Sequence, residues 1–315
     1  MRVIVPDYYK EFSCIADQCR HSCCIGWEID IDKDSLARFD ALDVPYGEIL
    51  RSRIDRSGET PHYRLGKQDR CPFLRENGLC EMILELGEDV LCQICADHPR
   101  FRNHFSDRTE LGVGLCCEAA GALILKRQQP MTLEVLEDDG EENTPDDEEE
   151  TLLSFRDMLL EILQDRSCTM DERLEELLSA CGAEEIDLSP ARWAKKLLEL
   201  ERLDENWTVL LKNLASQNQF DLPVLHTPAW ETAFEQAAVY FLFRHLPAAL
   251  EDGDISSKAA FAALSVTILR GLCAGKASPT TDDLVEFARM YSGEVEYSEE
   301  NLQAVFDLLY SDLTT

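Results

Sequence analysis

Apolar and polar residues follow a different pattern on either side of residue 150 in this chain of 315 residues. From residue 151 onward, apolar residues recur at spacings of three and four, which predicts amphipathic helices. Several of these stretches begin at plausible caps, such as Ser189 before Pro190. The expected helices cover residues 151–164, 170–181, 190–203, 207–217, 229–246, 256–273, 281–291 and 298–309.

Large aromatic residues lie on the apolar faces of these predicted helices. Aromatic side chains at helical spacing mostly fill the core of a domain. We therefore expect an all-helical domain over residues 151–315, with a core that includes Trp193, Trp207, Trp230, Phe241 and Phe243.

The first part of the chain shows shorter and more mixed patterns. Residues 27–32 alternate between apolar and acidic side chains, which predicts a short half-buried strand. Asp32 or Asp34 can then cap the helix that follows. Three further elements are expected, a second short strand at 62–66 and helices over 79–91 and from about Glu110 to Leu125.

Between the two parts, residues 134–150 consist largely of aspartate and glutamate. So many like charges do not pack together, which indicates an acidic linker or an exposed loop. The predicted fold is therefore mainly α. A small Cys-rich α+β metal-binding domain occupies residues 1–130, an acidic linker or loop residues 131–150, and an acidic all-helical domain residues 151–315.

The charge of the chain is strongly negative and unevenly distributed. The formal net charge is −32, and residues 1–127 contribute only 17 basic against 22 acidic residues. An acidic surface repels the phosphate backbone, so we expect no nucleic-acid partner. It would attract a lysine-rich protein, although a well-solvated acidic surface without a partner explains the same composition.

The sequence also bears on the compartment. The N-terminal ten residues lack the apolar run and cleavage site of a signal peptide. The longest apolar stretch, residues 237–250, is interrupted by Arg244, His245 and Pro247, and is too short for a membrane span. We therefore expect a cytoplasmic protein without a membrane partner, in which thiols stay reduced.

Cysteines are concentrated at the start of the chain, where ten of the 13 precede residue 118. Clustered thiols in a reducing compartment favour metal binding over disulfides. The three later ones, Cys168, Cys181 and Cys273, stand alone in helical patterns and are expected in the core. The early ones form the groups Cys14-x4-Cys19-x3-Cys23-Cys24, Cys71-x8-Cys80, Cys92-x2-Cys95 and Cys116-Cys117.

Two kinds of metal fit these groups. Structural zinc takes four cysteines, or three and a histidine, and four histidines are available at His21, His62, His98 and His104. A cubane iron–sulfur cluster takes four cysteines. Because regular paired C-x2-C motifs are missing, the pattern favours an iron–sulfur cluster, with zinc as the alternative. One site with extra thiols and two separate sites both remain open.

Several segments resemble the flagellin lysine-N-methylase family. They cover roughly residues 5–125, and the first cysteine group also resembles a broader group with a CxxxCxxCC motif, described as a zinc- or iron-chelating domain, although each gap here is one residue longer. The segments are Tyr8-Tyr9, Cys14 to Trp27, Cys71-Pro-Phe-Leu with Gly78-Leu-Cys80, Leu86 to Arg100 with its His98-Pro99-Arg100, and Cys116 to Ala120.

The resemblance implies methyl transfer from S-adenosylmethionine to lysine amines of flagellin or a similar lysine-rich protein. It also implies a 4Fe-4S cluster held by the N-terminal cysteines. The family cysteines fall on Cys14, Cys19, Cys23, Cys24, Cys71, Cys80, Cys95 and Cys116. Cys92 and Cys117 are weaker ligand candidates, because relatives commonly carry serine and proline at these two places.

The methyltransferase chemistry has no independent motif in the sequence. A Gly-rich cofactor loop is missing, since Gly112-Val-Gly114 is only G-x-G. Lysine methylation needs a neutral amine, and a polar group near the cysteines would take its proton. The candidates by proximity are Tyr8, Tyr9, Asp97 and His98 for the proton, and Trp27 and Arg100 for the cofactor.

Two other functions fit the same residues. A zinc-binding interaction protein without catalytic activity would use the thiols for structure and the acidic helices for docking. A thiol redox sensor would switch Cys92 and Cys95 between thiol and disulfide.

Overall fold

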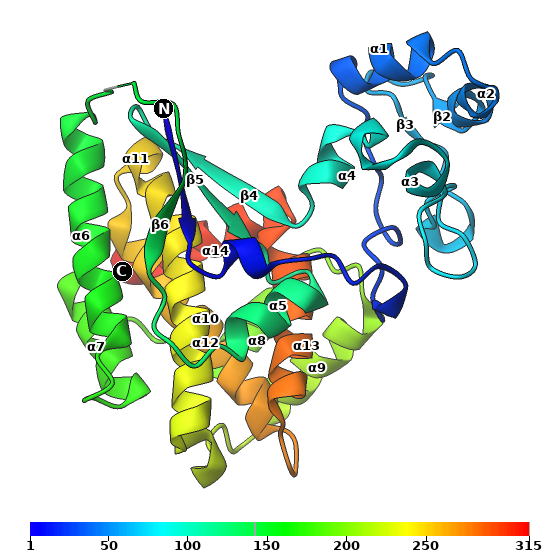
Figure 1. The fold of residues 1–315 in the computed structure, drawn as a ribbon. Helices are drawn as coiled ribbons and strands as arrows, with labels where there is room; N and C mark the ends of the chain where they lie inside the picture. Colours follow the sequence, from blue (N-terminus) through cyan, green and yellow to red (C-terminus); the bar gives the residue numbers. More distant parts are fainter. Residues whose placement is uncertain (142, 315) are drawn as a thin grey trace. The chain divides into compact units, whose positions relative to one another are not determined.

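The computed structural model describes residues 1–141 and 143–314. The chain divides into two compact units (Figure 1). The helical unit comprises Met1–Phe12 and Phe101–Thr315, and the cysteine unit comprises Ser13–Arg100. Each unit is described by itself.

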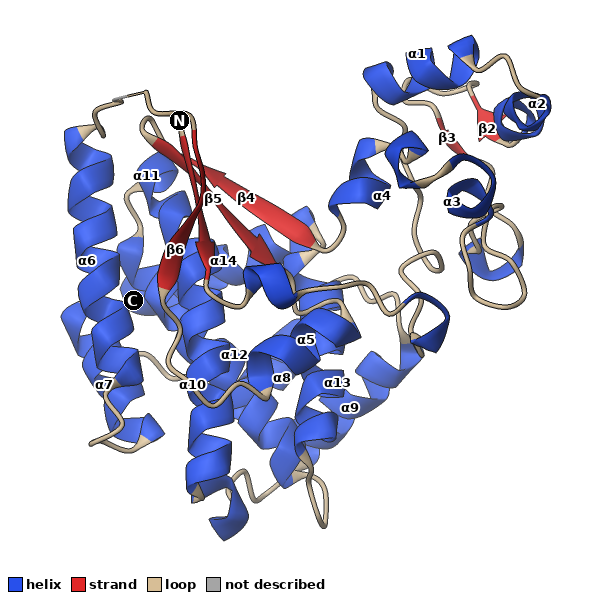
Figure 2. Ribbon diagram, in the orientation of Figure 1, coloured by secondary structure: helices blue, strands red, loops and turns tan. Residues whose placement is uncertain are grey.

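Helices dominate the chain after residue 146 (Figure 2). Their positions confirm the predicted helices. The largest difference is at α8, which ends at Leu197, six residues before the predicted end at 203. The helices are α6 (Asp147–Gln164), α7 (Met170–Ala180), α8 (Pro190–Leu197), α9 (Glu205–Ser216), α10 (Pro228–His245), α11 (Ala249–Asp252), α12 (Ile255–Ala274), α13 (Thr281–Tyr291) and α14 (Glu299–Thr314).

The core of the helical unit is built around α10 and α12, which are apolar on most sides. The predicted core aromatics are all buried, among them Trp193 and Phe241 with no exposed surface. Cys273 is also fully buried, whereas Cys168 is only partly buried. The length and composition of α12 would suit a membrane span, yet 83% of its most apolar window is buried inside the unit, as in a core helix.

A four-stranded sheet belongs to the same unit, in the order β4-β5-β1-β6. Strand β1 runs parallel to β5 and antiparallel to β6. The sequence pattern did not predict this sheet, because its strands are short and come from distant segments. The strands are β1 (Arg2–Pro6), β4 (Arg100–His104), β5 (Arg108–Val113) and β6 (Leu133–Asp138).

Strand β5 corrects the predicted helix from Glu110 to Leu125, since α5 covers only Glu118–Leu125. Glu110 is fully buried, and its carboxylate accepts two hydrogen bonds from Arg156 of α6, at 2.5 and 2.8 Å. Glu110 was predicted as the approximate start of that helix and instead lies in β5.

The acidic stretch forms regular structure within the helical unit, and the division into units differs from the predicted boundary at residues 131–150. Strand β6 lies at the edge of the sheet, where acidic side chains can face solvent. Helix α6 begins with a capping box between Asp146 and Glu149, and acidic residues in a first turn are favoured by the helix dipole. Residues 139–141 and 143–146 between these elements form a loop, which lies inside the helical unit and not between two domains.

The cysteine unit contains short helices and little regular sheet. In the predicted strand at 27–32, Ile29 and Ile31 are buried, but only Asp30 forms a bridge, to His62. The predicted helix at 79–91 is broken at Gly87, whose φ is 87°. The elements are α1 (Lys33–Ala41), capped by Asp32, α2 (Pro45–Ser52), β2 (Ile54–Asp55), β3 (His62–Tyr63), α3 (Glu81–Leu86) and α4 (Gln93–Asp97).

Candidate metal centre

Five thiols come together in the cysteine unit, although they come from three separate parts of its sequence. They interact electrostatically as a group: Cys71 with Cys24, Cys80 and Cys92, and Cys95 with Cys24, Cys71 and Cys92. We call this group the thiol cluster, and its members are Cys24, Cys71, Cys80, Cys92 and Cys95.

Backbone hydrogen bonds bring the first two segments together. The N–H of Cys71 donates to the carbonyl oxygen of Cys24 across 2.8 Å, and the N–H of Gly26 donates to Asp69 across 3.1 Å. Ile25 and Arg70 form an antiparallel bridge between these bonds. The main chain therefore fixes the spacing of Cys24 and Cys71, independently of their side chains.

Cys80 is returned toward Cys71 by a tight turn, as the Asn77-Gly78 pair predicts. Gly78 adopts a φ of 82°, in the left-handed region that glycine tolerates best. Leu74 and Cys80 then form an antiparallel bridge. Cys80 and Cys92 occupy the N-cap positions of α3 and α4, respectively, so both thiols lie at helix starts.

The pKa values within the thiol cluster are pushed in opposite directions. A hydrogen bond from Cys23 lowers the pKa of Cys24 to about 7, and a hydrogen bond from Cys95 lowers that of Cys92 to about 7. Burial raises the pKa of Cys71 to about 12. Thiolates in this group, of which Cys71 and Cys92 are buried and the other three partly buried, would repel one another, and a bound metal cation would offset that repulsion. The donor set therefore fits a thiophilic metal.

Apolar side chains surround the thiol cluster, including Tyr63, Phe73 and Met82, each at most 1% exposed. The Tyr63 ring packs edge-on against Phe73, with 5.0 Å between ring centres. The Tyr63 hydroxyl interacts with Cys92, and burial raises the pKa of this phenol well above its usual value. This wall restricts access of water to the thiols.

The other three cysteines of the first group lie nearer the surface. Cys14 is exposed and its sulfur accepts from the N–H of Ala16 at 3.4 Å, while the thiol of Cys19 donates to the carbonyl of His21 at 3.2 Å. The loop that carries them packs on the second segment, because a Cβ at Gly78 would lie 3.2 Å from Asp17 Cα. The ligand roles of Cys14, Cys19 and Cys23 stay predictions.

Cys116 and Cys117 belong to the helical unit, and the thiol cluster of residues 13–100 forms without them. Burial raises the pKa of Cys116 to about 12, partly offset by a hydrogen bond from the Tyr297 hydroxyl. Cys117 occupies the N-cap of α5. The ligand role of Cys116, which the family resemblance implies, stays a prediction, and so does that of Cys117.

Next to Cys116 is a buried polar network that sequence reasoning missed. The Tyr240 hydroxyl accepts from Arg244 Nη1 at 2.7 Å and donates to Glu296 at 3.1 Å. The His245 ring lies 2.6 Å from the same carboxylate. The available signal was an Arg-His pair inside the apolar stretch 237–250, where a charge is costly without a partner.

The shape of this network depends on a π-helical turn over Ser292–Glu296, a rare element often found at functional sites. The turn places Glu296 in the interior and leaves Tyr297 41% exposed. The Arg244 guanidinium lies over the rings of Phe101 and Tyr297, at 4.8 and 4.7 Å from their centres. A cation is thus held between two rings beside a buried carboxylate.

The tyrosines predicted to take a proton lie in the helical unit. Tyr8 is 3% exposed within its core, under the guanidinium of Arg127, and burial raises its pKa. A phenol in this position is held as a neutral core group. Tyr9 is partly buried against the same core.

The remaining predicted residues lie in the cysteine unit. The Trp27 indole N–H donates to the carbonyl of Cys23 at 2.6 Å, and its ring centre lies 6.1 Å from that of His98. Burial lowers the pKa of His98 to about 4, so its imidazole is neutral at pH 7. Arg100 donates to the carbonyl of Ala96. Trp27 therefore holds the loop that carries Cys23 and Cys24.

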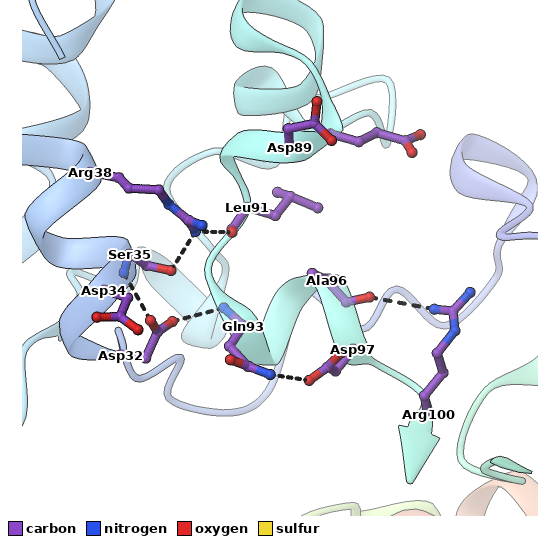
Figure 3. Close-up of a pocket in the computed structure, with 11 residues that line it drawn as sticks. Asp32, Asp34, Ser35, Arg38, Asp89, Leu91, Gln93, Ala96, Asp97 and Arg100 are labelled. Atoms are coloured by element: carbon purple, nitrogen blue, oxygen red, sulfur yellow. Dashed lines mark hydrogen bonds between the residues drawn. The ribbon is translucent and has the colours of Figure 1, made fainter. Parts of the chain in front are cut away.

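A pocket of about 510 Å³ in the cysteine unit is lined by residues of α4 and of the segments next to it (Figure 3). Asp32 accepts hydrogen bonds from the N–H groups of Ser35 and Gln93, which fixes the start of α1 against α4. Carboxylates outnumber cations in the lining, which favours positively charged groups. The charged lining residues are Asp32, Asp34, Glu88, Asp89, Asp97, Arg38 and Arg100.

The G-x-G segment at Gly112 has a packing role. Gly112 lies in β5, and a Cβ added there would come within 2.2 Å of the Phe101 ring. The glycine therefore leaves room for the Phe101 ring, and the Arg244 guanidinium packs over that ring.

The chain thus combines a cysteine unit that gathers five thiols with a helical unit that encloses a buried charged network. Residues 175–315 match the family model of the FliB lysine N-methylase C-terminal domain. The predicted resemblance to the flagellin lysine-N-methylase family is confirmed over this C-terminal part of the chain.

Named relatives are similar to part of the chain. The chain is 27% identical over 137 residues to the lysine-N-methylases of Salmonella typhimurium strain LT2 and Salmonella choleraesuis, a match that covers 42% of this chain and 34% of theirs. The chain thus spans about a third of the length of these relatives. It is 26% identical to the flagellar biosynthetic protein FliU of Salmonella muenchen, covering 81% of that protein. No solved structure matches.

Proposed function

We propose that the protein is a protein-lysine N-methyltransferase that transfers the methyl group of S-adenosylmethionine to lysine amines of flagellin or a similar lysine-rich protein. The observation that carries the proposal is the thiol cluster, found in a chain whose C-terminal part matches the FliB lysine N-methylase domain. Relatives named lysine-N-methylase support the type of reaction.

The thiol cluster would hold a 4Fe-4S cluster, with Cys24, Cys71, Cys80, Cys92 and Cys95 as its nearest donors. Cys92 belongs to this set on geometric grounds, although family resemblance ranks it lower. Bound there with one iron free of protein ligands, an iron–sulfur cluster would supply a Lewis-acidic site for the amino and carboxyl groups of the methionine moiety. Zinc is the alternative occupant.

The residues of the chain would supply the environment for the transfer. The amine of lysine reacts only when neutral, and a site lined by Tyr63 and Phe73 favours the neutral form by desolvation. The carboxylates of the pocket beside α4 would attract a lysine-rich segment. The neutral imidazole of His98 would orient groups by hydrogen bonding. We place this activity in the cytoplasm, where the thiols stay reduced.

Anaerobic purification followed by elemental analysis and a titration with S-adenosylmethionine tests the proposal. We expect iron and sulfide in the protein, saturable cofactor binding, and methyl increments on recombinant flagellin measured by mass spectrometry. The variant Cys71→Ser should lose metal and activity together, while Cys168→Ser, a single thiol in the helical unit, keeps both. Cluster-loaded protein that binds no S-adenosylmethionine would contradict the proposal.

One observation favours a second candidate function, a thiol redox switch. Cys92 and Cys95 share a hydrogen bond, which lowers the pKa of Cys92 to about 7, as in reactive C-x2-C pairs. A disulfide between them would form with loss of two electrons and two protons to a thiol oxidant such as oxidised glutathione. Mass spectrometry of the oxidised protein decides between the two functions, because the switch requires a Cys92–Cys95 disulfide.

A further inference from the structure

The cysteine unit has a second cluster of metal-ligating side chains, formed without any cysteine. Glu28, Asp30 and His62 each offer one ligand atom, and these atoms all lie within 4.8 Å of one another. We propose that they bind one divalent transition-metal cation. This inference stands independently of the methyltransferase proposal.

The sequence pattern places the two carboxylates side by side. Burial alternates over residues 28–31: Ile29 and Ile31 have 1% and 2% of their surface exposed, whereas Glu28 and Asp30 are exposed. Successive side chains of an extended chain point to opposite faces, and residues two apart share a face. Glu28 and Asp30 therefore project together on the outer side.

The backbone brings the histidine opposite the carboxylates. Asp30 and His62 are partners in an antiparallel bridge. The N–H of Ile31 donates to Pro61 at 2.8 Å, and the N–H of Tyr63 donates to Ile29 at 3.1 Å. Directly opposed residues have Cβ atoms about 5 Å apart, which suits two ligands of one ion. The main chain therefore preorganises the group.

The imidazole orientation is fixed in the way that metal-binding histidines require. His62 Nδ1 lies 3.1 Å from the carbonyl oxygen of Thr60, and because a carbonyl only accepts, Nδ1 carries the proton. Nε2 consequently faces Glu28, with 3.5 Å between Nε2 and Oε2. Metal-ligating histidines commonly donate their other N–H to a carbonyl or carboxylate in this manner.

The spacing suits a metal ion better than a direct hydrogen bond. A distance of 3.5 Å exceeds the usual hydrogen-bond range of about 2.7–3.2 Å. Zinc bonds of about 2.0–2.2 Å to nitrogen and oxygen, at a tetrahedral angle, place two ligand atoms about 3.4 Å apart. Two carboxylates also balance the charge of a dication, and the donor set of oxygen and imidazole nitrogen suits zinc or manganese. A surface ion pair with protonated His62 is the alternative.

A cation at this position would link the two segments that position the thiol cluster. The segment with Glu28 and Asp30 follows directly from Cys24, and the segment with His62 leads on to Cys71. The ion would thus add a cross-link to a region that otherwise contains only two-residue strands. A cation that binds only the folded state stabilises it, and the stabilisation grows with the logarithm of the cation concentration above the Kd.

Titration of the full-length protein, with its thiol cluster loaded, with Mn²⁺ under electron paramagnetic resonance tests the site. Manganese prefers oxygen and nitrogen donors, so the thiols do not compete. We expect one saturable Mn²⁺, displaced by Zn²⁺, and an affinity about tenfold or more weaker in His62→Gln, Asp30→Asn and Glu28→Gln. Glu59→Gln is the matched control, an exposed carboxylate nearby, and should leave the affinity unchanged.

Equal Mn²⁺ affinity in the wild type and in all three variants would overturn the proposal, as would absence of binding. The side chain of Glu28 is 61% exposed, so Glu28→Gln is expected to fold even if His62→Gln does not, and circular dichroism verifies each variant. A wild-type protein in which saturating Zn²⁺ fails to displace Mn²⁺ would also contradict a shared site.

Discussion

The N–H of Cys71 and the carbonyl oxygen of Cys24 are joined by a hydrogen bond of 2.8 Å between their main chains. Two thiols from distant parts of the sequence are therefore neighbours before any metal binds. The pairing of Ile25 with Arg70 and of Leu74 with Cys80 extends the same arrangement to a third thiol. The thiol cluster is thus built on the backbone, and a change to one cysteine removes a donor without displacing the others.

Replacement of Cys24 by serine should abolish metal binding while the unit stays folded. The Cys24 thiol has a pKa of about 7, so it is substantially ionised at neutral pH and ready to bind. Serine keeps the backbone bond but offers no thiolate. Iron and zinc content measured after purification should fall about tenfold or more.

The control is Cys273→Ser, in which a fully buried thiol outside the cysteine unit is changed. This variant should lose some stability and keep its metal. Full metal content in Cys24→Ser would show that Cys24 is not a ligand.

The ion pair of Glu110 and Arg156 leads to a prediction on stability. Both side chains are buried, and two hydrogen bonds join β5 to α6. Glu110→Gln leaves the guanidinium buried without its counter-ion and should cost about 3–5 kcal/mol. Urea unfolding followed by tryptophan fluorescence reports this loss, because Trp193, Trp207 and Trp230 all lie in the helical unit.

The double variant Glu110→Leu with Arg156→Met should recover much of that loss, since it removes both buried charges. The exposed pair Arg56–Asp40 supplies the comparison, and its disruption should cost at most about 1 kcal/mol. A loss for Glu110→Gln as small as that for the exposed pair would contradict the argument.

The sequence predicts an element of this structure well when the pattern that specifies it lies within one segment of the chain. Helices such as α13 were predicted at their observed bounds because helical periodicity is contained within one segment. The sheet was missed because β1 pairs with β5, which lies more than a hundred residues away. The hydrophobic pattern within one segment does not show which distant segment will pair with it. Charge misled at the acidic strand β6, because its pairing with β1 is revealed only by the fold.

The grouping of the thiols was predicted in part, and the metal itself stays a prediction. The density of cysteines pointed to metal, and the Asn77-Gly78 turn anticipated the return of Cys80 toward Cys71. Cys92 was ranked low on family resemblance, yet it lies inside the thiol cluster. The Arg244-His245 pair indicated a buried charge, but its partner Glu296 could not be predicted, because a π-helical turn in a distant segment brings it to α10.

Asp107 should make stability depend on pH. Burial alone would raise the pKa of this carboxyl, but hydrogen bonds from Arg108 and Arg2 outweigh it, and the folded pKa lies below the usual value. The carboxyl group has a pKa of about 3.9 in the unfolded chain and a lower pKa in the folded protein. At a pH above 3.9 this difference stabilises the folded protein, and the stabilisation is lost as the pH falls through the lower pKa. The wild type should therefore exceed Asp107→Asn in urea midpoint at pH 6, and the difference should shrink toward pH 3.

The exposed Glu175 on α7 provides the control, and Glu175→Gln should show a small difference at every pH. A constant gap between wild type and Asp107→Asn down to pH 3 would mean that the ionised carboxylate is not the source of the stability.

Gly112→Ala should disturb the contact between the Phe101 ring and the Arg244 guanidinium. The added Cβ would lie 2.2 Å from Phe101 Cζ, so the ring must move, and the guanidinium 4.8 Å above that ring loses its support. Overpacking of this kind costs about 1–3 kcal/mol. Gly293→Ala is the matched control, since nothing lies within 4 Å of its Cβ position. Urea unfolding should separate the two variants, and equal midpoints would show that Phe101 has room to shift without cost to the fold.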